Sequence, residues 1–234
     1  MKGKDLTERV YREIKKDLML RKIPSSELFS EQMLADRYHC SRTPAREAAG
    51  RLVAEGYLNK YPSRGYIVRL PTEREMYEMR YCCYTLERTA LGLAIHNAYR
   101  EELLSLNKLL DEEYEDPDLA YFSNMTFHYE LAKLSGNQII VSYIERLHGL
   151  MIRGESAPNY RGSAYLGQSM PESGEFHGAQ RNMEMERENH RKIVEAMANS
   201  DLRTAVTWLC HDYYPDLPVE KISAGETGGD FCAI

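Results

Sequence analysis

The segment SRTPARE, residues 41–47, carries two arginines whose spacing suits a shared partner. Arg42 and Arg46 are four residues apart, so in a helix they lie on one face, with Thr43 beside them. Arginine can donate two hydrogen bonds to O6 and N7 of guanine, and the N–H groups at a helix start can hold a phosphate. The segment therefore suits the edge of a DNA groove, but two solvated surface arginines would give the same pattern.

Apolar residues at helical spacing predict three helices around this segment, over 5–20, 31–38 and 42–55. Ser30 is a good N-cap for the second helix, and Gly56 suits the end of the third. The third helix has a stripe of alanines that allows close packing against the other two. The buried side of the second helix is predicted to comprise Met33, Leu34 and Tyr38.

A β-hairpin is predicted next, from strand-like runs at 57–61 and 66–70 on either side of a Pro-Ser-Arg-Gly turn. Three helices, with a tight turn between the second and third, followed by a hairpin form a winged helix-turn-helix arrangement. Arg64 at the basic tip of the hairpin is placed to enter an adjacent minor groove.

Charge is distributed unevenly along the chain, whose formal net charge is −6. Residues 1–70 hold 15 Lys and Arg against 9 Asp and Glu, a net +6, and the remainder holds 15 against 27, a net −12. A basic first third on an acidic remainder suggests that only the first part meets a polyanion, although chance clustering is the alternative.

After Pro71-Thr72 the strand signals nearly vanish, and helices separated by short polar breaks are predicted. These helices cover 73–98, 100–115, 117–134, 137–153, 183–199 and 202–214. The fold class is therefore mainly α: a winged helix-turn-helix domain followed by an all-α antiparallel helical bundle.

The resulting organisation has a DNA-binding domain at 1–71, a linker at 72–75, a helical effector-binding and dimerisation domain at 76–220, and a flexible tail at 221–234. Residues 154–182 are rich in Gly, Ser and Pro, and they are long for a loop within a compact domain. We expect this loop to be functional or mobile.

Composition narrows the class of protein further. No apolar run is long enough to span a bilayer, and the five cysteines lack metal-binding spacing. Both observations favour a cytoplasmic protein in a reducing compartment, without a membrane partner. The chain has no GxSxG motif, phosphate-binding loop or clear nucleophile–base set, so we do not expect an enzyme.

Residues 1–70 resemble the N-terminal domain of the GntR family of bacterial transcription regulators. The matching segments are SEQMLADRY (30–38), SRTPAREAAGRLVAEGYL (41–58) and SRGYIV (63–68). His39 stands where the family usually has a glycine in the turn between helices, and it tolerates left-handed backbone less well than glycine does. The resemblance implies that the family's DNA-contacting positions are occupied by Gln32, Ser41, Arg42, Thr43, Arg46, Ser63, Arg64 and Gly65.

The helical bundle resembles the all-helical FCD domain of the FadR-type branch. The matching segments are TLERTALGLA (85–94), NMTFHYELAKLSGN (124–137) and ENHRKIVEAMANSDLRTAV (188–206). Many such domains hold a divalent metal with an aspartate, a histidine four residues later, and two further histidines. The metal then helps to hold a small carboxylate ligand.

That ligand set is altered in this chain. The resemblance implies a site made of Asn124, His128, His190 and Asp212, with His211 as the alternative to Asp212. Two imidazoles and one carboxylate can still bind Zn²⁺, Ni²⁺ or Mn²⁺. The alternative is that the two histidines are satisfied core residues that line a metal-free pocket.

Arg146 and Arg153 are the candidates to bind an effector carboxylate, with Arg153 preferred. Cys83 stands where family members often have an arginine four residues before Glu87. The resemblance implies a homodimeric repressor that binds a pseudo-palindromic operator in double-stranded DNA and responds to a small organic acid. A metal-dependent hydrolase and a ligand-free DNA-binding dimer are the alternatives.

Overall fold

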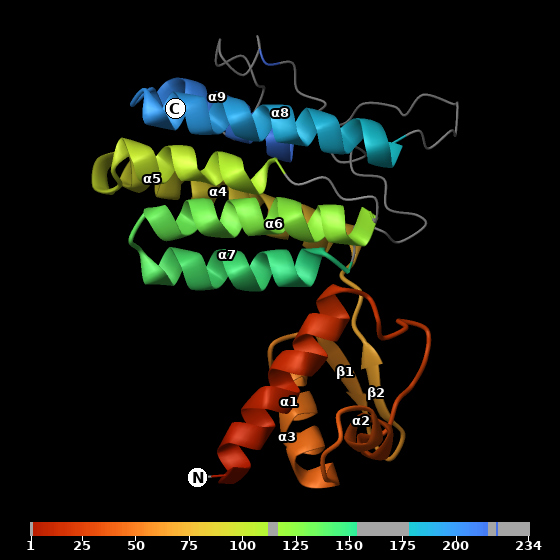
Figure 1. Cartoon of the computed structure of the whole chain (residues 1–234). Helices are drawn as coiled ribbons and strands as arrows, with labels where there is room; N and C mark the ends of the chain where they lie inside the picture. Colours follow the sequence, from red (N-terminus) through yellow and green to blue (C-terminus); the bar gives the residue numbers. More distant parts are fainter. Residues whose placement is uncertain (1, 112–116, 154–177, 215–218, 220–234) are drawn as a thin grey trace, which may run out of the picture. The chain divides into compact units, whose positions relative to one another are not determined.

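A computed structural model describes residues 2–111, 117–153, 178–214 and 219 (Figure 1). These residues divide into two units, and the first division falls after Glu73, within the predicted linker. Residues 149–153, which the sequence assigns to the helical domain, belong to the first unit instead. Within the described part of the chain, no helix has the length and hydropathy to cross a bilayer.

The first unit is the expected winged helix-turn-helix, in which three helices precede a two-stranded antiparallel sheet. Its elements are α1 (Lys2–Met19), α2 (Glu31–Arg37), α3 (Arg42–Ala54), β1 (Leu58–Tyr61) and β2 (Gly65–Val68). Figure 1 shows the sheet beside α1 and α3. The predicted helices and hairpin are therefore confirmed, with their ends shifted by a few residues.

The core of this unit forms where α1 packs against the small residues of α3. Val10 and Ile14 on α1 are fully buried, as are Ala45 and Ala48 on α3. The prediction for Met33 is wrong, because its side chain is 54% exposed. Since α2 has only two turns, its buried stripe is the narrow one formed by Leu34, Ala35 and Tyr38.

Local signals explain the connections around α2 and the hairpin. The Ser30 side chain accepts a hydrogen bond from the backbone N–H of Met33, so it caps α2 as predicted. His39 in the turn has a φ of 50°, the left-handed conformation that its position requires. Gly65 begins β2 with a φ of 115°, and a Cβ there would collide with the carbonyl of Phe29. Only glycine fits at this start of the wing.

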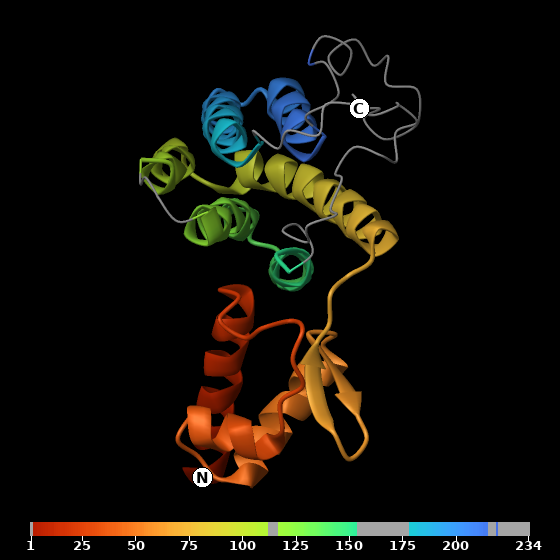
Figure 2. The same cartoon turned by 90° about the vertical axis from the view of Figure 1, so that its right-hand side faces the viewer.

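The second unit is a bundle of helices. Figures 1 and 2 show α8 and α9 side by side, with α5, α6 and α7 stacked along nearly the same direction. Its elements are α4 (Glu73–Asn97), α5 (Arg100–Ser105), the 3₁₀ turn η1 (Leu106–Leu109), α6 (Pro117–Leu134), α7 (Gln138–Met151), α8 (Gly178–Ala198) and α9 (Leu202–Tyr213).

Two of the predicted helix ends in this unit differ from the structure. The helix predicted over 100–115 ends as an α-helix at Ser105 and continues as a 3₁₀ turn. Helix α8 begins at Gly178, inside the stretch predicted to be a loop. Residues 154–177 of that loop and the tail from 220 lie outside the described residues. Asp201 caps α9 by accepting from the Thr204 N–H, which fixes where α9 begins.

Candidate functional site

The predicted DNA-contacting residues of α3 lie together at its exposed start. Arg42, Thr43 and Arg46 are exposed, whereas Pro44 between them is buried in the first turn. Ser41 occupies the N-cap position with an extended backbone, but its side chain makes no cap hydrogen bond. The start of α3 therefore offers both guanidinium groups and a hydroxyl side chain to the solvent.

Arg42 has only a weak protein partner. Its Nη2 lies 3.9 Å from Glu31 Oε2, and the arginine side chain remains 68% exposed. Exposed ion pairs at such a distance contribute little to stability. The guanidinium can therefore exchange this contact for a phosphate or a base edge at small cost.

The other predicted contacts lie on α2 and at the turn of the wing. Gln32 is exposed and donates to Asp36 Oδ1 at 2.7 Å. Ser63 and Arg64 are exposed in the turn between the strands. Gly65 differs from the rest, because the collision of a Cβ with Phe29 gives it a structural role whatever it contacts.

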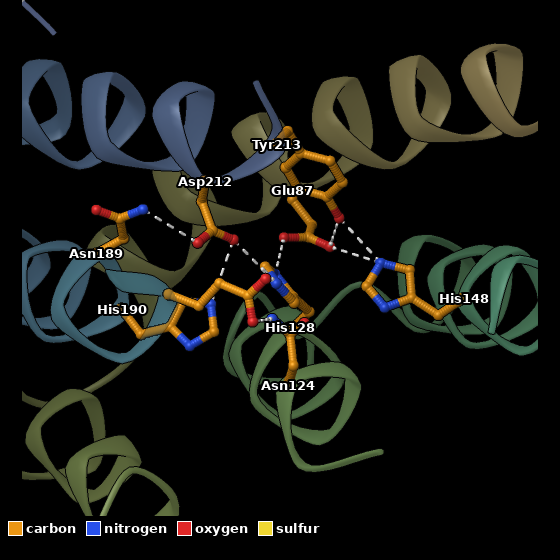
Figure 3. Close-up of polar contacts among 9 residues, drawn as sticks. Glu87, Asn124, His128, His148, Asn189, His190, Asp212 and Tyr213 are labelled. Carbon is orange, nitrogen blue, oxygen red and sulfur yellow. Dashed lines mark hydrogen bonds and ion pairs between the residues drawn. The ribbon is translucent and has the colours of Figure 1, made fainter. Parts of the chain in front are cut away.

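A second group of polar side chains is buried inside the helical unit. Figure 3 shows them converging on one another, and the element bounds assign them to five helices. They are Glu87 on α4, His128 on α6, His148 on α7, His190 on α8, and Asp212 and Tyr213 on α9. We call these six residues the histidine–carboxylate cluster.

Three of the four predicted metal residues meet at the centre of this cluster. Asp212 Oδ2 lies 3.3 Å from His128 Nε2 and 3.2 Å from His190 Nε2. The three ligand atoms all lie within 4.8 Å of one another. His190 also stacks on the Phe127 ring, at 3.9 Å between centroids and 11° between planes, which fixes the orientation of its imidazole.

Glu87 orients the other side of His128. Its Oε2 lies 2.7 Å from His128 Nδ1, and its Oε1 accepts from the Tyr213 hydroxyl at 2.7 Å. His148 Nε2 lies 2.9 Å from the same hydroxyl and 3.3 Å from Glu87 Oε1. With Nδ1 hydrogen-bonded to a carboxylate, the Nε2 atom of His128 faces Asp212 and His190 (Figure 3).

Electrostatics decide which members of the cluster carry charge. Burial opposes ionisation of Glu87, but His128 and His148 outweigh it and lower the pKa of this carboxyl to about 2. Burial also acts to lower the pKa of His128, yet Glu87 and Asp212 raise it to about 10. Burial dominates at His190 and lowers its pKa. Without a cation, His128 is therefore an imidazolium between two carboxylates, and His190 is neutral.

The donor set fits a first-row divalent metal. Imidazole nitrogen and carboxylate oxygen are the donors that Zn²⁺, Ni²⁺ and Mn²⁺ accept, and they converge here from three different helices. The carboxylate behind His128 is the kind of partner that orients metal-binding histidines in proteins.

Asn124 and His211 lie apart from this trio. Asn124 Nδ2 donates to Glu186 Oε2 on α8 at 3.0 Å. The His211 ring packs edge-on against Trp208, at 5.8 Å between centroids. Of the two alternatives at the C-terminal end of α9, the structure thus brings Asp212 rather than His211 to the two histidines.

The structure brings neither effector-binding arginine to the cluster. Arg153 belongs to the winged unit, where its guanidinium lies 4.6 Å from the ring centroid of Tyr57 and donates to the carbonyls of Tyr57 and Gly56. Burial lowers the pKa of Arg153 to about 10. Arg146 is exposed on α7. The buried guanidinium of Arg153 therefore donates hydrogen bonds to backbone carbonyls. No sequence pattern indicates these contacts.

Sequence reasoning missed Glu87, His148 and Tyr213 as members of the cluster. Glu87 and His128 are 41 positions apart, and His148 and Tyr213 are 65 apart, so no local spacing links them. The one available signal was an ionisable residue on the apolar face of a predicted helix, as at Glu87.

The winged unit, joined to a helical unit with a buried ligand-type cluster, defines the class of two-domain transcription regulators. Residues 6–68 match the family described as bacterial regulatory proteins, gntR family, and residues 75–212 match the FCD domain. The chain belongs to this family, as a GntR protein with an FCD domain of the FadR type.

Two proteins similar to this chain are described as transcriptional regulators. The chain is 28% identical to the Nta operon transcriptional regulator of Aminobacter aminovorans over 125 residues, which cover 52% of this chain and 60% of that protein. It is 28% identical to the HTH-type transcriptional regulator McbR of Escherichia coli over 152 residues, covering 63% and 69%. The solved structure of E. coli McbR/YncC has the same fold, with a TM-score of 0.68 and 23% identity over 94% of this chain and 98% of that one.

Proposed function

We propose that this protein is a cytoplasmic transcription regulator whose DNA affinity is set by a small organic acid and a divalent metal in the helical unit. The observation that carries the proposal is the histidine–carboxylate cluster, in which His128, His190 and Asp212 converge within 4.8 Å. The exposed start of α3 supplies the DNA-binding half of the function.

The winged unit would bind double-stranded DNA through the start of α3 in the major groove and Arg64 near the minor groove. A homodimer would place two such units on the half-sites of a pseudo-palindromic operator. The protein would act as a repressor controlled by this effector. The effector would bind one arrangement of the two winged units more tightly than another, and it would thereby change the affinity for the operator.

His128, His190 and Asp212 would hold the metal, with Glu87 fixing the tautomer of His128. When bound, the metal supplies a positive centre to which a carboxylate ligand can bind. Tyr213 and His148 complete the hydrogen bonding of Glu87 and keep it aimed at His128. Regulation is favoured over metal-dependent hydrolysis because the named relatives regulate transcription.

Two measurements test this proposal separately. For DNA, Arg42→Ala should lose specific operator binding in a gel-shift assay, while its circular dichroism spectrum and oligomeric state remain those of the wild type. Full specific affinity in this variant would contradict the assignment of α3. For metal, elemental analysis of protein purified without a chelator or His-tag should find one divalent metal per chain, and a metal-free result would remove the metal from the proposal.

A further inference from the structure

Glu31, the first residue of α2, lies between the first residue of α3 and the sheet of the winged unit. Its Oε2 is 3.9 Å from Arg42 Nη2, and its Oε1 accepts a long hydrogen bond, of 3.5 Å, from the Tyr66 hydroxyl on β2. Burial raises the pKa of Tyr66, and the Glu31 carboxylate raises it further, so the hydroxyl keeps its proton. A carboxylate therefore faces an arginine that is assigned to DNA contact.

The backbone around Glu31 fixes where this carboxylate lies. Ser30, directly before it, is the N-cap of α2, and Phe29 exchanges two backbone hydrogen bonds of 2.9 Å with Tyr66. Tyr66 is almost completely buried, and the Glu31 side chain is 22% exposed, against 68% for Arg42. The ion pair is weak enough for the arginine to leave it, but the carboxylate stays in place when the arginine moves to DNA.

Such a carboxylate affects two kinds of DNA contact differently. A phosphate bound to Arg42 brings a second negative charge near the one on Glu31, and the two anions repel each other. A guanine edge presents the neutral acceptors O6 and N7, so it meets no such repulsion. A guanidinium has five N–H donors, so a bidentate contact with a base leaves others for the carboxylate. Glu31 therefore favours a base edge over a phosphate as the partner of Arg42.

We propose that Glu31 is a specificity-determining residue, which acts through Arg42 to weaken phosphate contacts while it allows base contacts. This inference rests on the role of Arg42 proposed above. It gives a function to an acidic side chain that lies beside the predicted DNA-contacting residues, in a segment whose net charge is otherwise positive.

The test measures the affinity of the full chain for two DNA duplexes by fluorescence anisotropy. The specific probe is a duplex that the wild type selects from a random-sequence pool, and the non-specific probe is a scrambled duplex of the same length and composition. Glu31→Gln should bind the scrambled duplex more tightly. The ratio of specific to non-specific affinity should therefore fall by about threefold or more, the scale of one repulsion between exposed unit charges.

Glu27→Gln is the matched control, because it removes the same charge from an exposed position four residues earlier in the chain. This variant should keep the wild-type ratio of specific to non-specific affinity. A ratio that falls equally in the Glu27 and Glu31 variants would overturn the assignment, since it would make the effect one of net charge alone.

The salt dependence of binding to the scrambled duplex reports whether Arg42 reaches a phosphate. In Glu31→Gln, the slope of log affinity against log salt should steepen by about 1, as expected for one additional phosphate contact. In the Arg42→Ala background, the same substitution should change neither the slope nor the affinity. An equal gain in affinity with and without Arg42 would mean that Glu31 does not act through this arginine.

Failure of this inference is distinguishable from failure of the DNA contact proposed above. If Arg42→Ala loses specific binding while Glu31→Gln changes both affinities by the same factor, the role of Arg42 stands and Glu31 does not determine specificity. If Arg42→Ala keeps full specific affinity, the role of Arg42 and this inference are both wrong.

Discussion

Glu87 Oε2 and His128 Nδ1 are 2.7 Å apart, in a part of the helical unit where both side chains are almost completely buried. The carboxylate comes from α4 and the imidazole from α6, so the pair joins two helices that are separate in sequence. It also decides which ring nitrogen of His128 faces the centre of the cluster.

Replacing Glu87 with glutamine should destabilise the protein and weaken metal binding. The variant leaves the buried His128 with its charge unpaired on the α4 side, and breaking a buried pair in this way costs about 3 kcal/mol. Urea unfolding at neutral pH measures this loss in the free energy of unfolding. Zn²⁺ affinity should fall by about tenfold or more, since the carboxylate orients the ligand.

Glu130→Gln is the control for Glu87. Glu130 also lies on a helix of this unit, but it is partly exposed and pairs with Lys133 three residues away. Such pairs contribute little, so the variant should stay within about 0.5 kcal/mol of the wild type. Equal urea midpoints for Glu87→Gln and Glu130→Gln would contradict the stabilising role assigned to the buried Glu87–His128 pair.

The metal-free protein should lose stability as pH rises. Glu87 and Asp212 raise the pKa of His128 to about 10 from a usual value of 6.5. The folded protein therefore binds this proton more tightly than the unfolded chain does. The resulting stabilisation is fully present below pH 6.5 and is lost as pH rises through about 10.

Urea unfolding of chelator-treated protein at several pH values between 6 and about 10 measures this effect. The comparison is with His128→Gln, which lacks the titrating group and should show a shallower decline. Parallel pH profiles for the two proteins would contradict the pKa assigned to His128. The same proton must leave when Nε2 binds a metal, so Zn²⁺ affinity should increase with pH over this range.

Gly65→Ala should destabilise the winged unit. A Cβ at this position meets the carbonyl of Phe29, and the φ of 115° is a strained conformation for alanine. The cost should be about 1–3 kcal/mol. The matched control is Gly50→Ala in α3, where a Cβ meets nothing within 4 Å, and there alanine should be neutral or stabilising by up to about 1 kcal/mol. Thermal melts should therefore give a lower melting temperature for Gly65→Ala than for the wild type, and an equal or higher one for Gly50→Ala.

Arg64→Ala should reduce the salt dependence of operator binding. If Arg64 neutralises a phosphate or lies in the minor groove, its loss should lower the slope of log affinity against log salt by about 1. Arg12→Ala removes the same charge from α1, where the side chain is 76% exposed and pairs with Glu8. The Arg12 variant should keep the wild-type slope. Equal slopes for all three proteins would remove Arg64 from the interface.

The winged unit could be predicted from sequence because its signals are local. Ser30 lies directly before the helix it caps, and the alanine stripe of α3 repeats within one helix. Met33 shows the limit of such patterns. In a helix of two turns, the choice of buried face depends on the neighbouring elements, and periodicity over so few residues does not define it.

The helical unit was predictable as a set of helices, but only part of its site was. His128 and His190 were accessible through the resemblance, because each lies within a matching segment. Glu87 and His148 join the cluster only because five helices pack around it, and their separation in sequence carries no spacing signal. The contacts of Arg153 could not be predicted, because a buried arginine that donates to carbonyls has the same sequence context as one that binds a ligand.

Trp208, packed against His211, is the only tryptophan of the chain and lies one turn before Asp212 on α9. The Lys192 ammonium sits 4.0 Å from its ring centroid, and Lys192 is on α8, two residues after His190. The indole of Trp208, which is on α9, thus contacts a side chain of α8 as well as one of α9. Both helices carry residues of the histidine–carboxylate cluster. The intrinsic fluorescence of Trp208 therefore reports on the packing of α8 against α9 without an attached dye.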